Sequence, residues 1–160
     1  MKKIIILTML AFAFNFSANA QKQNFTFSVG GGFSSISASG GNGNSTTGFG
    51  VDVVGRTNLS ETFEGFVQTG YSSFSDNGVS LGHIPFLVGV NFQAGVFKPG
   101  LGVGYGNFSG NNSSTGGFAF SPQIGYNIDK VDVIAHYTST SLNNGSFNII
   151  GLKLLYKISK

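Results

Sequence analysis

Apolar residues alternate with polar residues or glycines along eight segments of this chain, and no other feature constrains its fold as strongly. A period of two indicates a β-strand with one apolar face. Most of the segments contain 9–11 residues, the length that a tilted strand needs to cross a bilayer, whereas strands of soluble sheets have about 5–6. We therefore expect eight membrane-spanning strands, at 24–33, 48–56, 63–72, 83–93, 97–108, 118–128, 130–138 and 148–158.

A sheet inside a membrane must close on itself, because an open edge would leave unpaired backbone N–H and C=O groups in hydrocarbon. The even number of segments also matches single-chain bacterial barrels. The connections predicted from these segments alternate between long and short, which is typical of a barrel with longer outer loops and short periplasmic turns. The predicted fold is all-β, an eight-stranded antiparallel up-and-down transmembrane β-barrel. The expected long loops are 34–47, 73–82, 109–117 and 139–147.

The first twenty residues have the form of a secretory signal peptide. Lys2 and Lys3 precede an apolar stretch of about eleven residues, and Ala18-Asn19-Ala20 provides the small residues of a cleavage site. We expect residues 1–20 to be removed and residues 21–160 to form the barrel domain. Together with the strand pattern, this predicts export to the cell outer membrane.

Composition supports a surface that faces lipid. Charged residues are only 9% of the chain, against roughly 25% in soluble domains, while there are 25 Gly and 17 Phe. Without residues 1–20 the chain has seven Lys and Arg against six acidic residues, so its net charge is about +1 and nucleic acid is not expected as a partner. There is no Cys and no zinc-like or dinucleotide-binding spacing, so we expect no metal and no cofactor.

The chain resembles the small eight-stranded outer-membrane β-barrel proteins, the OmpX-like and OmpA-barrel-like class, in the form common among Bacteroidota. The resemblance rests on the signal peptide, the eight alternating segments and a final amphipathic run, Gly151-Leu152-Lys153-Leu154-Leu155-Tyr156-Lys157-Ile158, similar to the C-terminal assembly signal of that class. It implies outer-membrane lipids as partners, and the outer-membrane assembly machinery during biogenesis. One departure is that such proteins usually end on an aromatic residue, whereas Tyr156 is the last aromatic here.

The parity of the strands sorts side chains between lipid and lumen. We expect the apolar row to face lipid, with Phe86, Val88, Val90, Leu101, Val103, Leu152 and Leu154 as its central members. The opposite parity predicts a polar network in the lumen: Asp52, Arg56, Glu64, Lys98, Asp132, His136 and Lys153. Eight strands enclose a space that side chains nearly fill, so a structural plug of paired charges is favoured over an open pore. Leakage of protons or small ions is the alternative.

No residue pattern supports catalysis strongly. Some barrels of this size modify lipid A with a His and a nearby Ser, and the nearest pattern here is His136-Tyr137-Thr138 with Asp132. Positions 132 and 136 lie about 13 Å apart along a strand and cannot pair directly. We expect no enzyme, a structural or surface-interaction role with an unidentified surface ligand, and an interfacial His83. The second candidate is a secreted, soluble, lipocalin-like barrel whose apolar rows would face inward.

Overall fold

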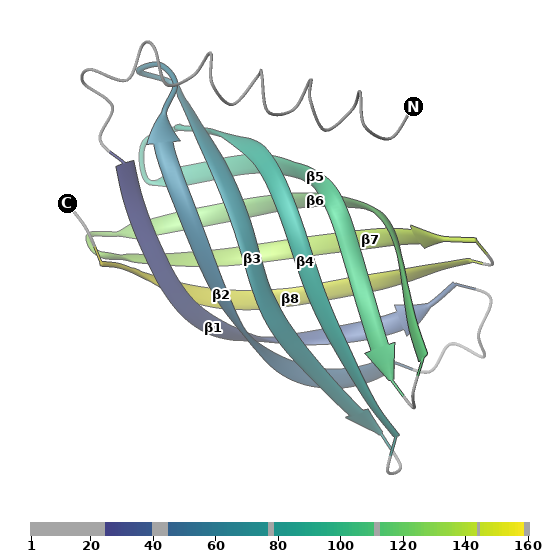
Figure 1. Cartoon of the computed structure of the whole chain (residues 1–160). Coiled ribbons are helices and arrows are strands. Elements are labelled where there is room, and N and C mark those ends of the chain that lie inside the picture. Colours follow the sequence, from purple (N-terminus) through teal and green to yellow (C-terminus); the bar gives the residue numbers. More distant parts are fainter. Residues whose placement is uncertain (1–24, 40–44, 77–78, 111–112, 144, 159–160) are drawn as a thin grey trace.

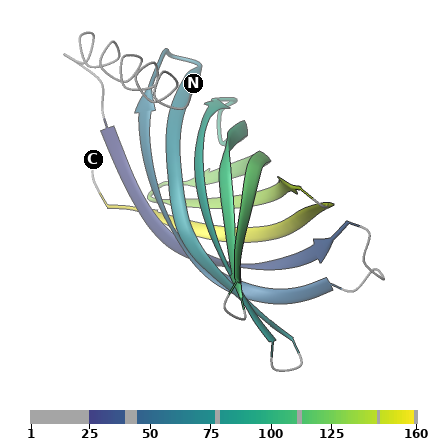
Figure 2. The ribbon, with the colours of Figure 1, turned by 45° about the vertical axis from the view of Figure 1, so that its right-hand side comes forward.

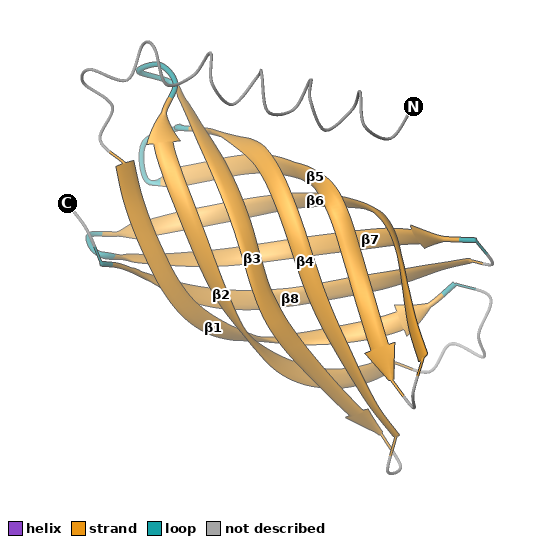
Figure 3. Ribbon diagram, viewed as in Figure 1, coloured by secondary structure: helices purple, strands orange, loops and turns teal. Residues whose placement is uncertain are grey.

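The computed structural model describes residues 25–39, 45–76, 79–110, 113–143 and 145–158, nearly all of them in strands (Figures 1 and 3). The expected signal peptide lies outside the described residues. No helix in the described part of the chain is long and apolar enough to cross a membrane, a test that does not bear on spanning by strands. The strands are β1 (Phe25–Ala38), β2 (Ser45–Asn58), β3 (Phe63–Asp76), β4 (Val79–Phe92), β5 (Phe97–Gly110), β6 (Ser113–Ile128), β7 (Val131–Leu142) and β8 (Gly145–Lys157).

The sheet closes because β1 pairs with β2 on one side and with β8 on the other, all antiparallel and in sequence order. Register partners followed once around the barrel lead from residue 28 to residue 38, ten residues further along β1. The path is Ser28, Val54, Gln68, Leu87, Gly104, Ala119, Thr140, Phe147 and Ala38. This stagger tilts the strands against the barrel axis and curves them, as Figure 2 shows. The predicted eight-stranded antiparallel barrel is confirmed.

The strands are longer than the alternation predicts, with 12 to 16 residues each. β1 continues to Ala38 and β2 begins at Ser45, so much of the expected loop 34–47 is strand. The expected loops 73–82 and 109–117 likewise fall mostly within strands, and long connections do not alternate with short ones. The prediction was wrong because outward residues in these stretches are Ser, Thr, Asn and Gly. The apolar residues there, such as Ile36 and Phe74, point inward, so the apolar-outward pattern ends while the backbone pairing continues.

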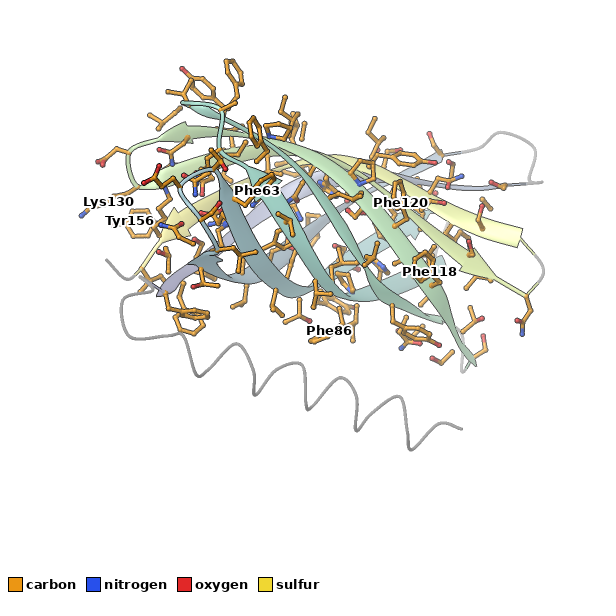
Figure 4. All side chains as sticks on the ribbon, turned by 90° about the horizontal axis from the view of Figure 1, so that it is seen from above. Phe63, Phe86, Phe118, Phe120, Lys130 and Tyr156 are labelled. Atoms are coloured by element: carbon orange, nitrogen blue, oxygen red, sulfur yellow. The ribbon has the colours of Figure 1, made fainter. Side chains whose placement is uncertain are left out.

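The outer face of the barrel is apolar. The seven residues expected to face lipid have 38 to 59% of their surface exposed, although all are large hydrophobic side chains. The rings of Phe86, Phe118 and Phe120 project from the outside of the barrel (Figure 4). A soluble barrel with an apolar interior would require the opposite parity, which the structure does not have.

The inside of the barrel is layered. We call the turn end the end where 59–62, 93–96 and 129–130 join strands and where β1 begins and β8 ends. Inward positions near that end are charged, the next inward positions are apolar, and the next are polar again. Val54, Phe66, Ile134 and Leu155 form the apolar layer, all at most 4% exposed. A second buried apolar cluster, Ile36, Phe74, Phe108 and Ile149, closes the opposite half.

Candidate functional site

Five charged side chains meet inside the barrel at the turn end. Arg56 Nη1 lies 3.1 Å from Asp132 Oδ2, and Arg56 Nε lies 3.6 Å from Glu64 Oε1. Lys98 Nζ lies 3.2 Å from Glu64 Oε2, and Lys157 Nζ lies 3.5 Å from Asp132 Oδ1. Because each of these residues lies within two positions of a strand end, the closed sheet brings five distant parts of the sequence to one level.

Neutral polar groups extend this cluster across the lumen. Asn91 Nδ2 donates to Glu64 Oε1 at 3.0 Å, and Gln123 Nε2 donates to Asn91 Oδ1 at 3.0 Å. Arg56 Nη1 also donates to Ser28 Oγ at 2.8 Å. The Asn91–Gln123 bond joins β4 to β6 across β5, whose inward residue there is Gly100. A Cβ at Gly100 would overlap Asn91 Oδ1, so the glycine makes room for this bond.

A second charged pair lies deeper in the barrel. Lys153 Nζ on β8 lies 3.5 Å from Asp52 Oδ1 on β2, and Gln68 Nε2 donates to the same oxygen at 2.9 Å. The Lys153 side chain is 4% exposed and the Asp52 side chain 14%. Paired and hydrogen-bonded in this way, the two charges avoid the large cost of an isolated buried ion.

Both histidines line a small cavity beside this pair. The cavity has a volume of about 20 Å³, room for about one water molecule, and Asp52 and Lys153 also contribute to its wall. His83 Nε2 and His136 Nδ1 are buried and have no hydrogen-bond partner among the described residues. The expectation of an interfacial His83 was wrong. β4 begins four residues before it, so His83 lies inside the barrel, stacked on Phe108 with ring centroids 4.4 Å apart.

The structure places the seven residues of the expected lumen network inside the barrel but in separate groups. Arg56, Glu64, Lys98 and Asp132 belong to the cluster at the turn end, whereas Asp52 and Lys153 form the deeper pair. His136 forms no hydrogen bond or ion pair with either group among the described residues. Sequence reasoning missed the apolar layer between the two groups and the second apolar layer beyond the deeper pair. The available signal was the set of apolar residues on the polar parity of their strands, namely Val54, Phe66, Ile134 and Leu155. The ring of Phe66 lies over Gly89 and Gly102.

The described residues show no metal cluster and no hydrogen bond between a histidine and a hydroxyl group. They contain no cluster of three His, Cys, Asp or Glu side chains able to hold a metal ion. Thr138, the candidate nucleophile, shares a hydrogen bond of 2.7 Å with Ser121 inside the barrel. The lumen instead contains a cluster of paired charges at the turn end and a second ion pair between two apolar layers.

Aromatic side chains surround the turn end on the outer face. Phe63 and Phe92 have ring centroids 5.6 Å apart, and Phe97 and Tyr126 have centroids 5.2 Å apart. Each pair joins neighbouring strands directly across the register. Tyr156 and Lys130 lie toward the same end (Figure 4). This arrangement is typical of side chains at a membrane–water interface.

Comparisons with known proteins show relatives in structure rather than in sequence. No protein-family model matches the chain, and no curated protein matches it in sequence. Ail, the attachment invasion locus protein of Yersinia pestis, is 15% identical with a TM-score of 0.59; the match covers 86% of this chain and 100% of Ail. Neisserial surface protein A is 16% identical with a TM-score of 0.59, covering 86% and 100%. The outer-membrane enzyme PagL is 14% identical with a TM-score of 0.52, covering 83% and 99%.

The chain therefore has the fold of the small eight-stranded outer-membrane β-barrel proteins. At these identities the likeness extends to the fold alone. The resemblance noted in the sequence is confirmed at that level.

Proposed function

We propose that this protein spans the outer membrane as a closed barrel with a structural or surface-interaction role and no open pore. The observation that carries the proposal is the distribution of side chains, which is the reverse of that in an ordinary soluble protein. Large apolar side chains are exposed around the barrel, and seven of the charged ones are nearly buried inside it. Such a surface is stable in hydrocarbon and would aggregate in water.

The turn end faces the periplasm in this proposal. The two ends of the described chain, at Phe25 and Ile158, lie there, and so do the four-residue connections 59–62 and 93–96 and the turn at 129–130. The aromatic pairs would then mark the inner interface. The opposite end, where strands continue as Ser- and Asn-rich hairpins, would face the outside and carry any surface interaction.

The filled lumen favours a structural network over conduction. Two apolar layers cross the interior, and the polar cavity beside Asp52 and Lys153, between these layers, has room for about one water molecule. We propose that the ion pairs hold the strands in register and that ions do not pass. The outer-membrane assembly machinery would act on the chain during insertion. From the sequence pattern we also propose that the protein is of the type common among Bacteroidota.

Fractionation and gel migration test the membrane part of the proposal. We expect the protein in the outer-membrane fraction, and we expect it to migrate differently in SDS before and after boiling. Recovery in the soluble fraction would overturn the proposal. In planar bilayers the folded protein should give no current above that of protein-free bilayers, and steady single-channel steps would contradict the closed lumen.

Enzyme activity is not part of the proposal, although one structural neighbour, PagL, is an outer-membrane enzyme. His136 faces the lumen instead of the lipid, and Thr138 is bonded to Ser121. Mass spectrometry of lipid A from cells with and without the gene provides the test. Equal spectra are expected, and a modification that disappears with the gene would overturn this part.

A further inference from the structure

The mouth of the barrel at the turn end contains a pocket that the structural role does not require. Its volume is about 620 Å³, within the range of about 300–1,000 Å³ for small-molecule sites. The pocket is lined by Thr26, Arg56, Thr57, Asn58, Glu64, Gln93, Lys98 and Lys157. These residues come from β1, β2, β3, β5 and β8 and from the connection after β4.

The pocket has a closed floor. Val54, Phe66, Ile134 and Leu155 lie two positions further along their strands than the charged residues of the mouth, and all four are buried. A molecule that enters from the turn end therefore cannot pass through the barrel. The mouth is a cup with one opening.

Positive charge is in excess within this cup. Three cations, Arg56, Lys98 and Lys157, are in contact with only two carboxylates, Glu64 and Asp132. At the same end, Asp129 and Lys130 in the turn between β6 and β7 offset each other, and Glu61, exposed in the connection 59–62, lies outside the pocket. Within the pocket and its ion pairs, the described residues therefore carry one positive charge more than negative charges.

Hydrogen-bond donors remain free to meet a ligand. Lys98 has three N–H groups and one contact among the described residues, with Glu64. Its side chain is 15% exposed and that of Lys157 is 21% exposed, so both reach the opening. The amides of Asn58 and Gln93, which bond to each other at 3.2 Å on the exposed rim, add neutral donors.

We propose that this cup binds a small polar molecule with one surplus negative charge, carried on a carboxylate or phosphate group, from the periplasmic side. The oxyanion would lie against Lys98 and Lys157, and the polar remainder would reach the rim amides. Only the side of entry rests on the proposed function. Binding itself can be measured in detergent micelles, so its failure would leave the membrane assignment untouched.

Paired probes give a direct test. The folded full-length protein in micelles, labelled with ¹⁵N, is titrated at low salt with glutamate against glutamine, and with glucose 6-phosphate against glucose. We expect saturable shifts of the Asn58 and Gln93 side-chain amide signals with at least one charged probe, and no saturable shifts with its neutral partner. Whether glutamate or glucose 6-phosphate binds shows whether the pocket recognises a carboxylate or a phosphate group. Equal responses to charged and neutral probes, or no response, would overturn the proposal.

Three variants locate the charge effect. Lys98→Gln should weaken binding at least about fivefold, because it removes one of the two cations that reach the opening. Lys130→Gln is the matched control: the residue lies at the same end (Figure 4) and is not among the residues that line the pocket, so binding should stay within twofold. Glu64→Gln should instead tighten binding about fivefold, because it removes the carboxylate in the wall while keeping a side chain of the same shape. Equal weakening by both lysine changes would overturn the proposal in favour of general charge attraction.

Discussion

Asp52 on β2 and Lys153 on β8 form an ion pair of 3.5 Å although β1 lies between their strands. The pair can form because the inward positions of β1 at that level are Gly30 and Gly32, which place no side chain between the two charges. At Gly30 a Cβ would overlap the carbonyl oxygen of Leu154, so the β8 backbone also approaches closely. A glycine pair in one strand thus determines which charges meet across it.

Lys153→Met should destabilise the barrel by about 3–5 kcal/mol, because it leaves Asp52 charged and partly buried without its cation. The free energy of unfolding is measured with urea in lipid vesicles. The single variant Asp52→Leu and the double variant Asp52→Leu with Lys153→Met complete the cycle. The double variant should lose less free energy of unfolding than the sum of the two single losses, since no unpaired charge remains. Additive losses would show that the two residues do not interact. Lys130→Met, at an exposed turn, is the control and should change stability by less than about 0.5 kcal/mol.

Gly30→Ala should prevent the chain from reaching the folded form that migrates differently before boiling. The added methyl would overlap backbone atoms of β8, which cannot rotate away as a side chain can. Gly125→Ala is the matched control on an inward position of β6. There the nearest atom to a new Cβ is Lys98 Cβ at 3.5 Å, an ordinary contact, so we expect normal folding. Folding of both variants to the same extent would contradict the close approach of β1 and β8.

Val88→Arg should cost about 2–4 kcal/mol of folding free energy in a bilayer, because the residue lies in the middle of β4 on the exposed apolar row. Val96→Arg, in the turn before β5, should cost only about 0–1 kcal/mol, since it lies at the level of the interface. Urea titration of refolding into vesicles measures both. A harmless Val88→Arg would show that this row does not face lipid.

The outer face was predictable from the sequence because lipid selects apolar residues at every second position, and Val88 and Leu152 follow that rule. The ion pairs and hydrogen bonds inside the barrel were not predictable in this way. Whether Asp52 meets Lys153, 101 positions away, depends on the register of β1 with both its neighbours, which alternation leaves open. Strand ends were also unpredictable, because β1 continues through Ser34–Ala38, where the outward residues are Ser and the apolar Ile36 points inward, the reverse of the expected pattern.

Phe66 is an aromatic residue on the polar face of β3, and its buried position predicts that its removal lowers stability without opening the lumen. Its ring is 4% exposed and packs over Gly89 and Gly102, which leave room for it. Phe66→Ala should destabilise the barrel by about 3–5 kcal/mol, because the two glycines under the ring have no side chains that could fill the cavity left by its removal. Phe33→Ala, at a ring that is 73% exposed on the outer face, should cost much less.

Despite this loss, folded Phe66→Ala should still carry no current in planar bilayers. Phe74 and Phe108, each 1% exposed, close the opposite half of the lumen together with Ile36 and Ile149. Removal of one apolar layer leaves this second one in place. Channel steps in Phe66→Ala alone would show that the layer around Val54 and Leu155 is the only barrier, whereas steps that require Phe74→Ala as well would show that two barriers act in series.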